Sequence, residues 1–151
     1  LFRVETNREM LNAVLTVGKK HKPDFAVFSA AVLDFEPKKK FQGKVSSKQK
    51  SWKIEFIPAP KIIDEYRKRF PETQLIEFKL ETRKFDAKKL GNTLLKYRGS
   101  LAVCLNRLSD IRGKLHRAVL IRRQGQPKIL STKAQIGSAI AQVLSNVEPA
   151  K

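Results

Sequence analysis

The chain has 151 residues, of which 41% are hydrophobic and 30% charged, a composition typical of a soluble globular domain. Its net charge of +18 comes from 32 Lys and Arg against 14 Asp and Glu, and it predicts attraction to polyanions or anionic ligands. The single cysteine excludes an internal disulfide, no apolar run reaches the roughly 18 residues that cross a membrane, and no signal peptide is visible. We therefore expect a protein of a reducing compartment, the cytoplasm or an organelle matrix, without a membrane partner.

The first half of the chain alternates between helix and strand patterns. Thr6 and Glu9 fit a capping box, in which a hydroxyl and a carboxylate satisfy the free amides of a first helical turn. Residues 25–33 are almost continuously apolar and predict a strand that is buried on both faces. Apolar and charged residues alternate over 52–56, which indicates a half-exposed strand that Pro58 ends. A short helix with one apolar face then runs up to Pro71.

The second half continues the alternation and ends differently. Strands are expected over 75–80 and 101–105, and Asp86 caps the helix between them. Residues 118–121 and 129–130 read as two strands joined through a Gly-Gln-Pro turn, before a helix that begins near Thr132. The pattern predicts one α/β domain over 1–148 with a tail at 149–151. Its fold would be a three-layer, Rossmann-like and mostly parallel sheet with a late antiparallel hairpin and a C-terminal helix.

Ligands of such sheets bind outside the carboxyl ends of the strands, and Asp34 follows the apolar run at such a position. A carboxylate there can hold Mg²⁺, a cation that prefers oxygen ligands and usually keeps phosphates as co-ligands. Lys44 follows Gly43 in a lysine-rich loop that could close over a phosphate and neutralise its charge. The alternative is structural: Asp34 caps a turn and residues 38–40 are a solvated run of lysines.

Other candidates are weaker. His21 and His116 have no second ligand at metal spacing, Cys104 lies in an apolar strand where an inert thiol is expected, and no glycine-rich phosphate motif occurs. Basic clusters at 38–40, 67–69, 88–89 and 122–123 could follow a nucleic-acid backbone, or could form an ordinary solvated surface.

Five stretches, in order and spacing, carry a resemblance to a known family. They are VETNREML (4–11), FAVFSAAVLDFEP (25–37), GKVSS (43–47), APKII (59–63) and IEFKLET (76–82). Together they resemble segments of phosphopantothenate–cysteine ligases, enzymes of coenzyme A biosynthesis. The resemblance extends from about residue 4 to 106, with a looser match beyond.

The resemblance implies a reaction and a set of site residues. ATP or CTP, with Mg²⁺, would activate the carboxylate of 4'-phosphopantothenate as an acyl-nucleotidylate, which the amine of cysteine then attacks. By the resemblance, Asp34 is the metal ligand and Lys44 the catalytic lysine. The implied nucleotide contacts are Asp34, Lys44, Ala59, Pro60, Lys61, Ile62, Phe78, Lys88, Lys89 and Lys96. Ala31 and Asn106 are the implied substrate contacts.

The chain also departs from the family. Nothing in it matches the family's glycine-rich N-terminal portion, Arg83 stands where an aspartate usually closes the signature, and Leu105 stands where an alanine usually precedes Asn106. We expect the chain alone not to catalyse ligation, and a homodimer or a complementary chain to supply the missing portion. The alternative is a family descendant without catalysis that binds RNA or another polyanion, within a large ribonucleoprotein assembly.

Overall fold

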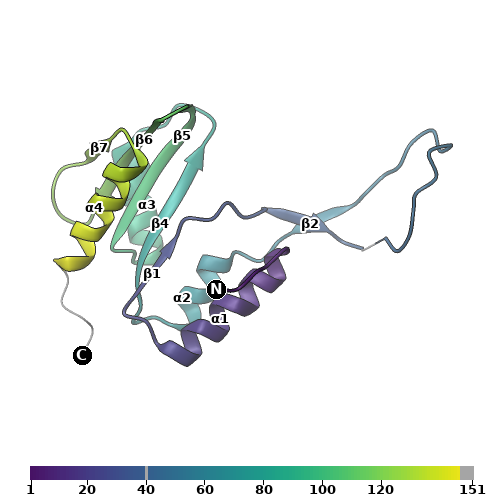
Figure 1. Cartoon of the computed structure of the whole chain (residues 1–151), viewed down its shortest axis with the longest axis horizontal. Helices are drawn as coiled ribbons and strands as arrows, with labels where there is room; N and C mark the ends of the chain where they lie inside the picture. Colours follow the sequence, from purple (N-terminus) through teal and green to yellow (C-terminus); the bar gives the residue numbers. More distant parts are fainter. Residues whose placement is uncertain (40, 147–151) are drawn as a thin grey trace.

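The computed structural model describes residues 1–39 and 41–146, so Lys40 and the expected tail at 149–151 lie outside the described residues. A five-stranded sheet forms the body, in the order β1-β4-β5-β6-β7 (Figure 1). Its first three strands are parallel and its last two are antiparallel to their neighbours. Their bounds are β1 Phe25–Phe28, β4 Gln74–Glu81, β5 Ala102–Arg112, β6 Leu115–Arg122 and β7 Lys128–Leu130.

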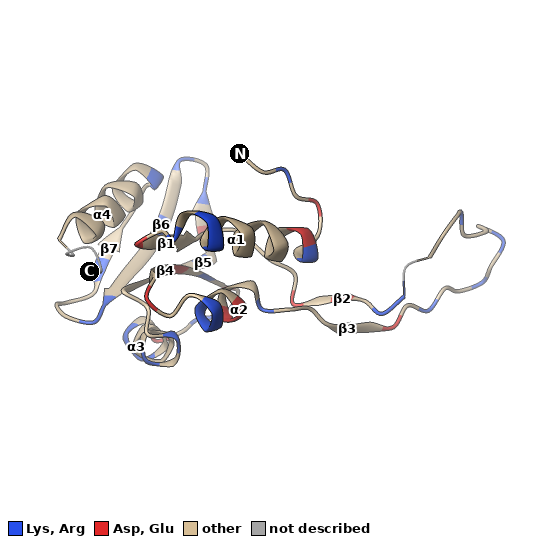
Figure 2. Cartoon of the chain, turned by 90° about the horizontal axis from the view of Figure 1, so that it is seen from below, with Lys and Arg blue, Asp and Glu red and all other residues tan. Residues whose placement is uncertain are grey.

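Within the described residues, four helices accompany this sheet: α1 Asn7–His21, α2 Ile62–Arg69, α3 Ala87–Arg98 and α4 Lys133–Ser145. Alternate residues of the strands face opposite sides, so two cores form. Cys104 and Leu120 belong to the core beneath α4, whereas Val103 and Ile121 belong to the core beneath α3. Helix α2 lies on the α3 side, where Tyr66 meets Phe28 edge to face, and α1 packs along α2 (Figure 2). The layers confirm the predicted α/β class.

Capping residues lie at the ends of these helices, as the sequence predicts. Thr6 and Glu9 form the complete capping box of α1. The Asp86 carboxylate accepts from the amide of Lys89 at 2.9 Å, and Gly99 ends α3 with a left-handed φ of 63°. None of the helices within the described residues is long and apolar enough to span a membrane.

A second, two-stranded sheet forms an arm. It pairs β2 (Phe35–Pro37) with β3 (Phe56–Pro58) in antiparallel register. The loop between these strands extends away from the five-stranded sheet, so that the arm and its loop project from the body (Figure 1). Residues 34–39 and 41–59 form this arm, and its base is the part next to the body.

The arm corrects three expectations. The strand predicted over 25–33 ends at Phe28 and is an edge strand, with Val27 44% exposed, so it is not buried on both faces. The apolar residues after it continue toward the arm, where Leu33 and Phe35 are exposed. Likewise, β3 occupies 56–58 and not 52–56. An apolar run usually predicts a buried strand. That prediction fails here because these side chains lie on an element that projects from the body.

The position of Asn106 needs a further correction. This residue does not end its strand, because β5 continues to Arg112 beyond a shift in register between Asn106 and Ile111. The turn at Gly113, with a φ of 56°, joins β5 to β6 in an antiparallel hairpin that the sequence pattern did not indicate. The later hairpin of β6 and β7 is confirmed.

Candidate functional site

Two distant segments meet at the base of the arm. The amide of Ala59 donates to the carbonyl oxygen of Asp34 at 2.9 Å. The ammonium group of Lys61 forms an ion pair with the Asp34 carboxylate. The FAVFSAAVLDFEP and APKII stretches are far apart in the sequence. They meet here because Phe35, the first residue of β2, pairs with Pro58, the last residue of β3. Together, the two stretches form one site at the base of the arm.

The charge of Asp34 is stabilised by its neighbours. The hydrogen bond from Lys61, together with its positive charge, lowers the pKa of Asp34, and the charge of Lys79 lowers it further. The side chains of Asp34 and Lys61 are 67% and 57% exposed, so both remain accessible to a ligand. This arrangement is an exposed carboxylate paired with one ammonium group, and a second ammonium group lies close enough to act on its charge.

Lys79 is the residue of this cluster that sequence reasoning did not select. It lies on β4, inside the IEFKLET stretch, and its ammonium group is 3.6 Å from the Glu81 carboxylate. Its closeness to the end of β4 was a usable signal, because ligands gather at the carboxyl ends of parallel strands. Only the fold brings it near Asp34, which is distant in sequence.

The N-terminus of α2 adds backbone amides to this region. Lys61 occupies the N-cap position, and no side chain there bonds the amides of the first turn. Ile62 and Ala59 are buried and anchor the segment between arm and helix. Pro60 has no amide hydrogen, and Ile62 starts the helix. Free amides at a helix start, beside a lysine, favour the binding of an anion.

Lys44 lies elsewhere on the arm. It is exposed in the loop between β2 and β3, which extends away from the body, whereas Asp34 is at the base (Figure 1). Gly43 before it has a φ of 108°, a conformation that glycine adopts readily. The structure does not bring Lys44 and Asp34 together, and their joint contact with one phosphate stays a prediction that needs movement of the loop.

The remaining predicted contacts are spread over the body. Phe78 packs against the core beneath α4, and Ala31 is exposed between β1 and the arm. Asn106 is 5% exposed and donates to the carbonyl oxygen of Arg117 at 3.2 Å, so its amide links β5 to β6. It lies beside Leu80 on the neighbouring strand. Three lysines are exposed along α3: Lys88, Lys89 and Lys96.

The residues present fit a metal ion only together with a ligand that brings its own oxygens. No group of three or more His, Cys, Asp or Glu is assembled within residues 1–39 and 41–146. A single accessible carboxylate suits Mg²⁺ that retains phosphate and water ligands, and it does not suit a permanently held metal. Cys104 is fully buried, and burial raises its pKa to about 12, as expected of an unreactive thiol.

Comparison with known proteins identifies the family. Residues 1–147 match the DNA/pantothenate metabolism flavoprotein C-terminal domain. The chain belongs to this family. It is also 34% identical, over 130 residues, to the coenzyme A biosynthesis bifunctional protein CoaBC of Thermococcus kodakarensis, an alignment covering 85% of this chain and 32% of that protein. The chain thus spans about a third of the relative's length, and the resemblance found in the sequence is confirmed.

Solved structures share the fold. The DNA/pantothenate metabolism flavoprotein of Streptococcus pneumoniae superposes with a TM-score of 0.80 at 19% identity, over 95% of this chain and 71% of that one. The C-terminal domain of CoaBC gives 0.69 at 21% identity, over 95% and 63%. A Cab2 variant in complex with phosphopantothenate-cysteine gives 0.53 at 19% identity, over 80% and 43%. Family membership favours the ligase hypothesis over a polyanion-binding descendant.

Proposed function

We propose that this chain forms the nucleotide-binding part of a phosphopantothenate–cysteine ligase. The overall reaction would join 4'-phosphopantothenate and cysteine through an acyl-nucleotidylate made from ATP or CTP. The observation that carries the proposal is the base of the arm, where Asp34, Lys61 and Lys79 lie near one another beside an uncapped helix start. This arrangement occurs in a chain whose family includes a protein of coenzyme A biosynthesis.

Each group at the base of the arm has a chemical role in this proposal. Lys61 and Lys79 attract the phosphates, and the first amides of α2 donate to phosphate oxygens. Asp34 would hold Mg²⁺ that arrives with the nucleotide, and the metal supplies neutralisation of the phosphate charge. Lys61 now pairs with Asp34, so a metal ion at that carboxylate would release the ammonium group of Lys61 for a phosphate.

Lys44 would join the site by movement of the arm loop. Its flexible stem and the glycine before it suit a cation that approaches only when a ligand is present. A cation that meets developing charge lowers the reaction barrier, and the loss of one such group typically costs about 100-fold in rate.

Pyrophosphate release tests this role. The assay contains the full native polypeptide, 4'-phosphopantothenate, cysteine, Mg²⁺ and either ATP or CTP. Lys44→Ala should reduce the rate about 100-fold. Lys48→Ala, in the same loop, is the matched control and should retain the wild-type rate. Equal rates for the two variants would remove Lys44 from the proposed mechanism, and no release by the wild type with either nucleotide would reject the ligase function.

We also propose that further polypeptide completes the sheet. Strand β1 has β4 as its neighbour on one side and is the edge strand on the other. On the face opposite α2, Val27 and Leu80 are 44% and 48% exposed. An open strand edge beside exposed apolar side chains is a template for another strand and a covering helix. A segment of this kind would cover Val27 and Leu80 and pair with the open edge of β1.

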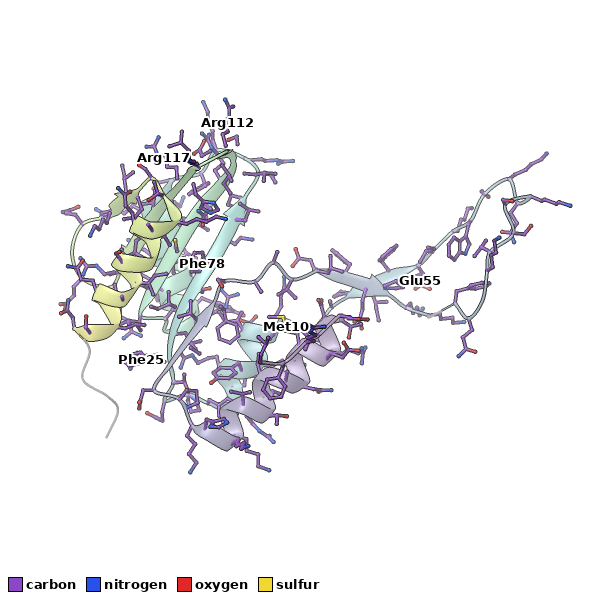
Figure 3. The ribbon with its side chains drawn as sticks, viewed as in Figure 1. Met10, Phe25, Glu55, Phe78, Arg112 and Arg117 are labelled. Atoms are coloured by element: carbon purple, nitrogen blue, oxygen red, sulfur yellow. The ribbon has the colours of Figure 1, made fainter. Side chains whose placement is uncertain are left out.

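The arm supports a second partner, another copy of this chain. Five large apolar side chains along it are between 43% and 59% exposed: Phe35, Phe41, Trp52, Ile54 and Phe56. Figure 3 shows side chains standing out from the arm on both sides of Glu55, away from the body. Monomers rarely expose so many large apolar groups together. Because most assemblies are symmetric homo-oligomers, we propose that the arm packs against a second copy.

A further inference from the structure

A largely buried ionic cluster includes Asp64 of the first turn of α2 and is unused by the proposed chemistry. Arg98, the last residue of α3, donates from Nε to the Asp64 carboxylate at 2.6 Å and from Nη1 to the Glu77 carboxylate at 2.6 Å. The hydroxyl of Ser100 donates to the other oxygen of Glu77 at 2.7 Å. The side chains of Arg98 and Glu77 are only 16% and 5% exposed.

The cluster joins three elements through one side chain. Glu77 comes from the middle of β4 and Asp64 from the first turn of α2, while Arg98 ends α3. Two acceptors are held at once by different nitrogens of the planar guanidinium group. A lysine has one ammonium group and cannot reproduce this fixed geometry.

Asp64 connects the cluster to the proposed nucleotide site. It lies three residues after Lys61, in the first turn of α2. An unpaired carboxylate in this turn would repel phosphates. Arg98 neutralises Asp64, and Lys68 similarly pairs with Glu65 at 2.7 Å, so both acidic residues of the turn have cationic partners.

We propose that Arg98 is a positioning residue for nucleotide binding. Through Asp64 it fixes the first turn of α2 against β4 and cancels the negative charge that would weaken phosphate binding there. Arg98 itself does not touch the ligand. The inference rests on the proposed nucleotide site. It makes that site depend on Arg98, which is 37 positions away from Lys61 in the sequence.

The test separates positioning from simple support of the fold. The variants are Arg98→Lys, Arg98→Met and the double variant Arg98→Met/Glu77→Gln, which removes the buried carboxylate that loss of Arg98 leaves unpaired. Arg112→Met, in the β5–β6 hairpin, is the control. Dissociation constants for Mg²⁺–ATP and Mg²⁺–CTP are measured by calorimetry, all in the full native polypeptide. Thermal midpoints are measured alongside, with hydrogen exchange of the first-turn amides of Asp64 and Glu65, which donate to the carbonyl oxygen of Lys61.

We expect both Arg98→Met proteins to bind nucleotide at least about tenfold more weakly, because Asp64 would lose its cationic partner beside the phosphates. The double variant should recover most of its thermal midpoint and still bind weakly, and Arg98→Lys should resemble Arg98→Met. Faster exchange in the first turn of α2 should accompany the loss of affinity.

Wild-type affinity in the double variant would overturn the inference, because Arg98 would then only support the fold. Unchanged amide exchange in the first turn of α2 would overturn it as well, whatever the nucleotide result. If the wild-type protein itself binds neither nucleotide, the proposed function fails, and the role of Arg98 in nucleotide binding fails with it. The wild-type and variant measurements therefore distinguish the two failures.

Discussion

At the scale of single residues, the pair of Asp34 and Lys61 explains why a carboxylate precedes the lysine-rich loop. The sequence offers a chemical and a structural explanation for Asp34, and the structure places its backbone and its carboxylate in different surroundings. Its carbonyl oxygen closes the base of the arm, whereas its carboxylate stays exposed beside two lysines. The backbone of Asp34 therefore contributes to the fold, and its side chain contributes to the proposed site.

The pKa of Asp34 tests this pairing. The hydrogen bond from Lys61 lowers that pKa, so the carboxylate stays charged to a lower pH than an ordinary aspartate. The pair is consequently present at neutral pH and is lost as the pH falls through the lowered pKa. Lys61→Met should raise the pKa of Asp34 toward its ordinary value, measured by a carboxyl NMR titration. Lys38→Met, which removes the partner of Glu55 instead, should leave it unchanged. An unchanged Asp34 titration in Lys61→Met would contradict the pairing.

At the scale of elements, two glycines in helices have opposite surroundings. A Cβ atom on Gly91 of α3 would lie 2.5 Å from Cγ1 of Ile121 on β6, so this glycine lets the helix approach the sheet closely. A Cβ atom on Gly137 of α4 would meet nothing within 4 Å. The same residue type thus reflects close packing in one helix and open space in the other.

Alanine substitutions should separate these two cases. Gly91→Ala should lower the free energy of unfolding by up to about 2 kcal/mol, because an overpacking cost of about 1–3 kcal/mol exceeds a gain of up to about 1 kcal/mol in helix propensity. Gly137→Ala should raise it by up to about 1 kcal/mol, since only the propensity gain applies. Urea denaturation of the three proteins measures both changes. Stabilisation by both substitutions would show that α3 does not pack closely on β6.

The elements also show how far local patterns predict this structure. Helix caps at Thr6 and Asp86 depend on neighbouring residues, and both were predictable. The arm was not, because exposed aromatic residues such as Phe35 and Phe56 have the composition of buried strands. The continuation of β5 beyond Asn106 was missed because polar residues follow it, in a hairpin that extends past β4.

At the scale of the whole molecule, the candidate site depends on long-range contacts. The individual stretches of the site were predictable from family resemblance. The ion pair of Asp34 with Lys61 and the nearness of Lys79 were not, since they follow from the arm's pairing and from the position of β4. The network around Arg98 is likewise invisible in the sequence, because its partners come from three separate elements.

The arm makes a prediction about assembly. If its apolar side chains pack against a second copy, sedimentation velocity should show a dimer at micromolar concentration. Replacing Phe41 and Trp52, whose rings meet edge to face, by serine should shift the protein toward monomer. Leu108→Ser is the control, since Leu108 is 54% exposed but lies on β5. A wild-type monomer, or a dimer that persists in the Phe41 and Trp52 variant, would exclude this interface.

The central claim, that the base of the arm binds a nucleotide with Mg²⁺, is tested most directly by calorimetric titration of ATP and CTP into wild type, Asp34→Asn and Asp24→Asn in the full native polypeptide. We predict Mg²⁺-dependent binding of one or both nucleotides. In Asp34→Asn this binding should weaken by about 10- to 100-fold, the scale of one contact to a charged group. Asp24→Asn, whose position immediately precedes β1, should bind like the wild type. Equal affinity in the wild type and Asp34→Asn, or binding that does not depend on Mg²⁺, would contradict the claim.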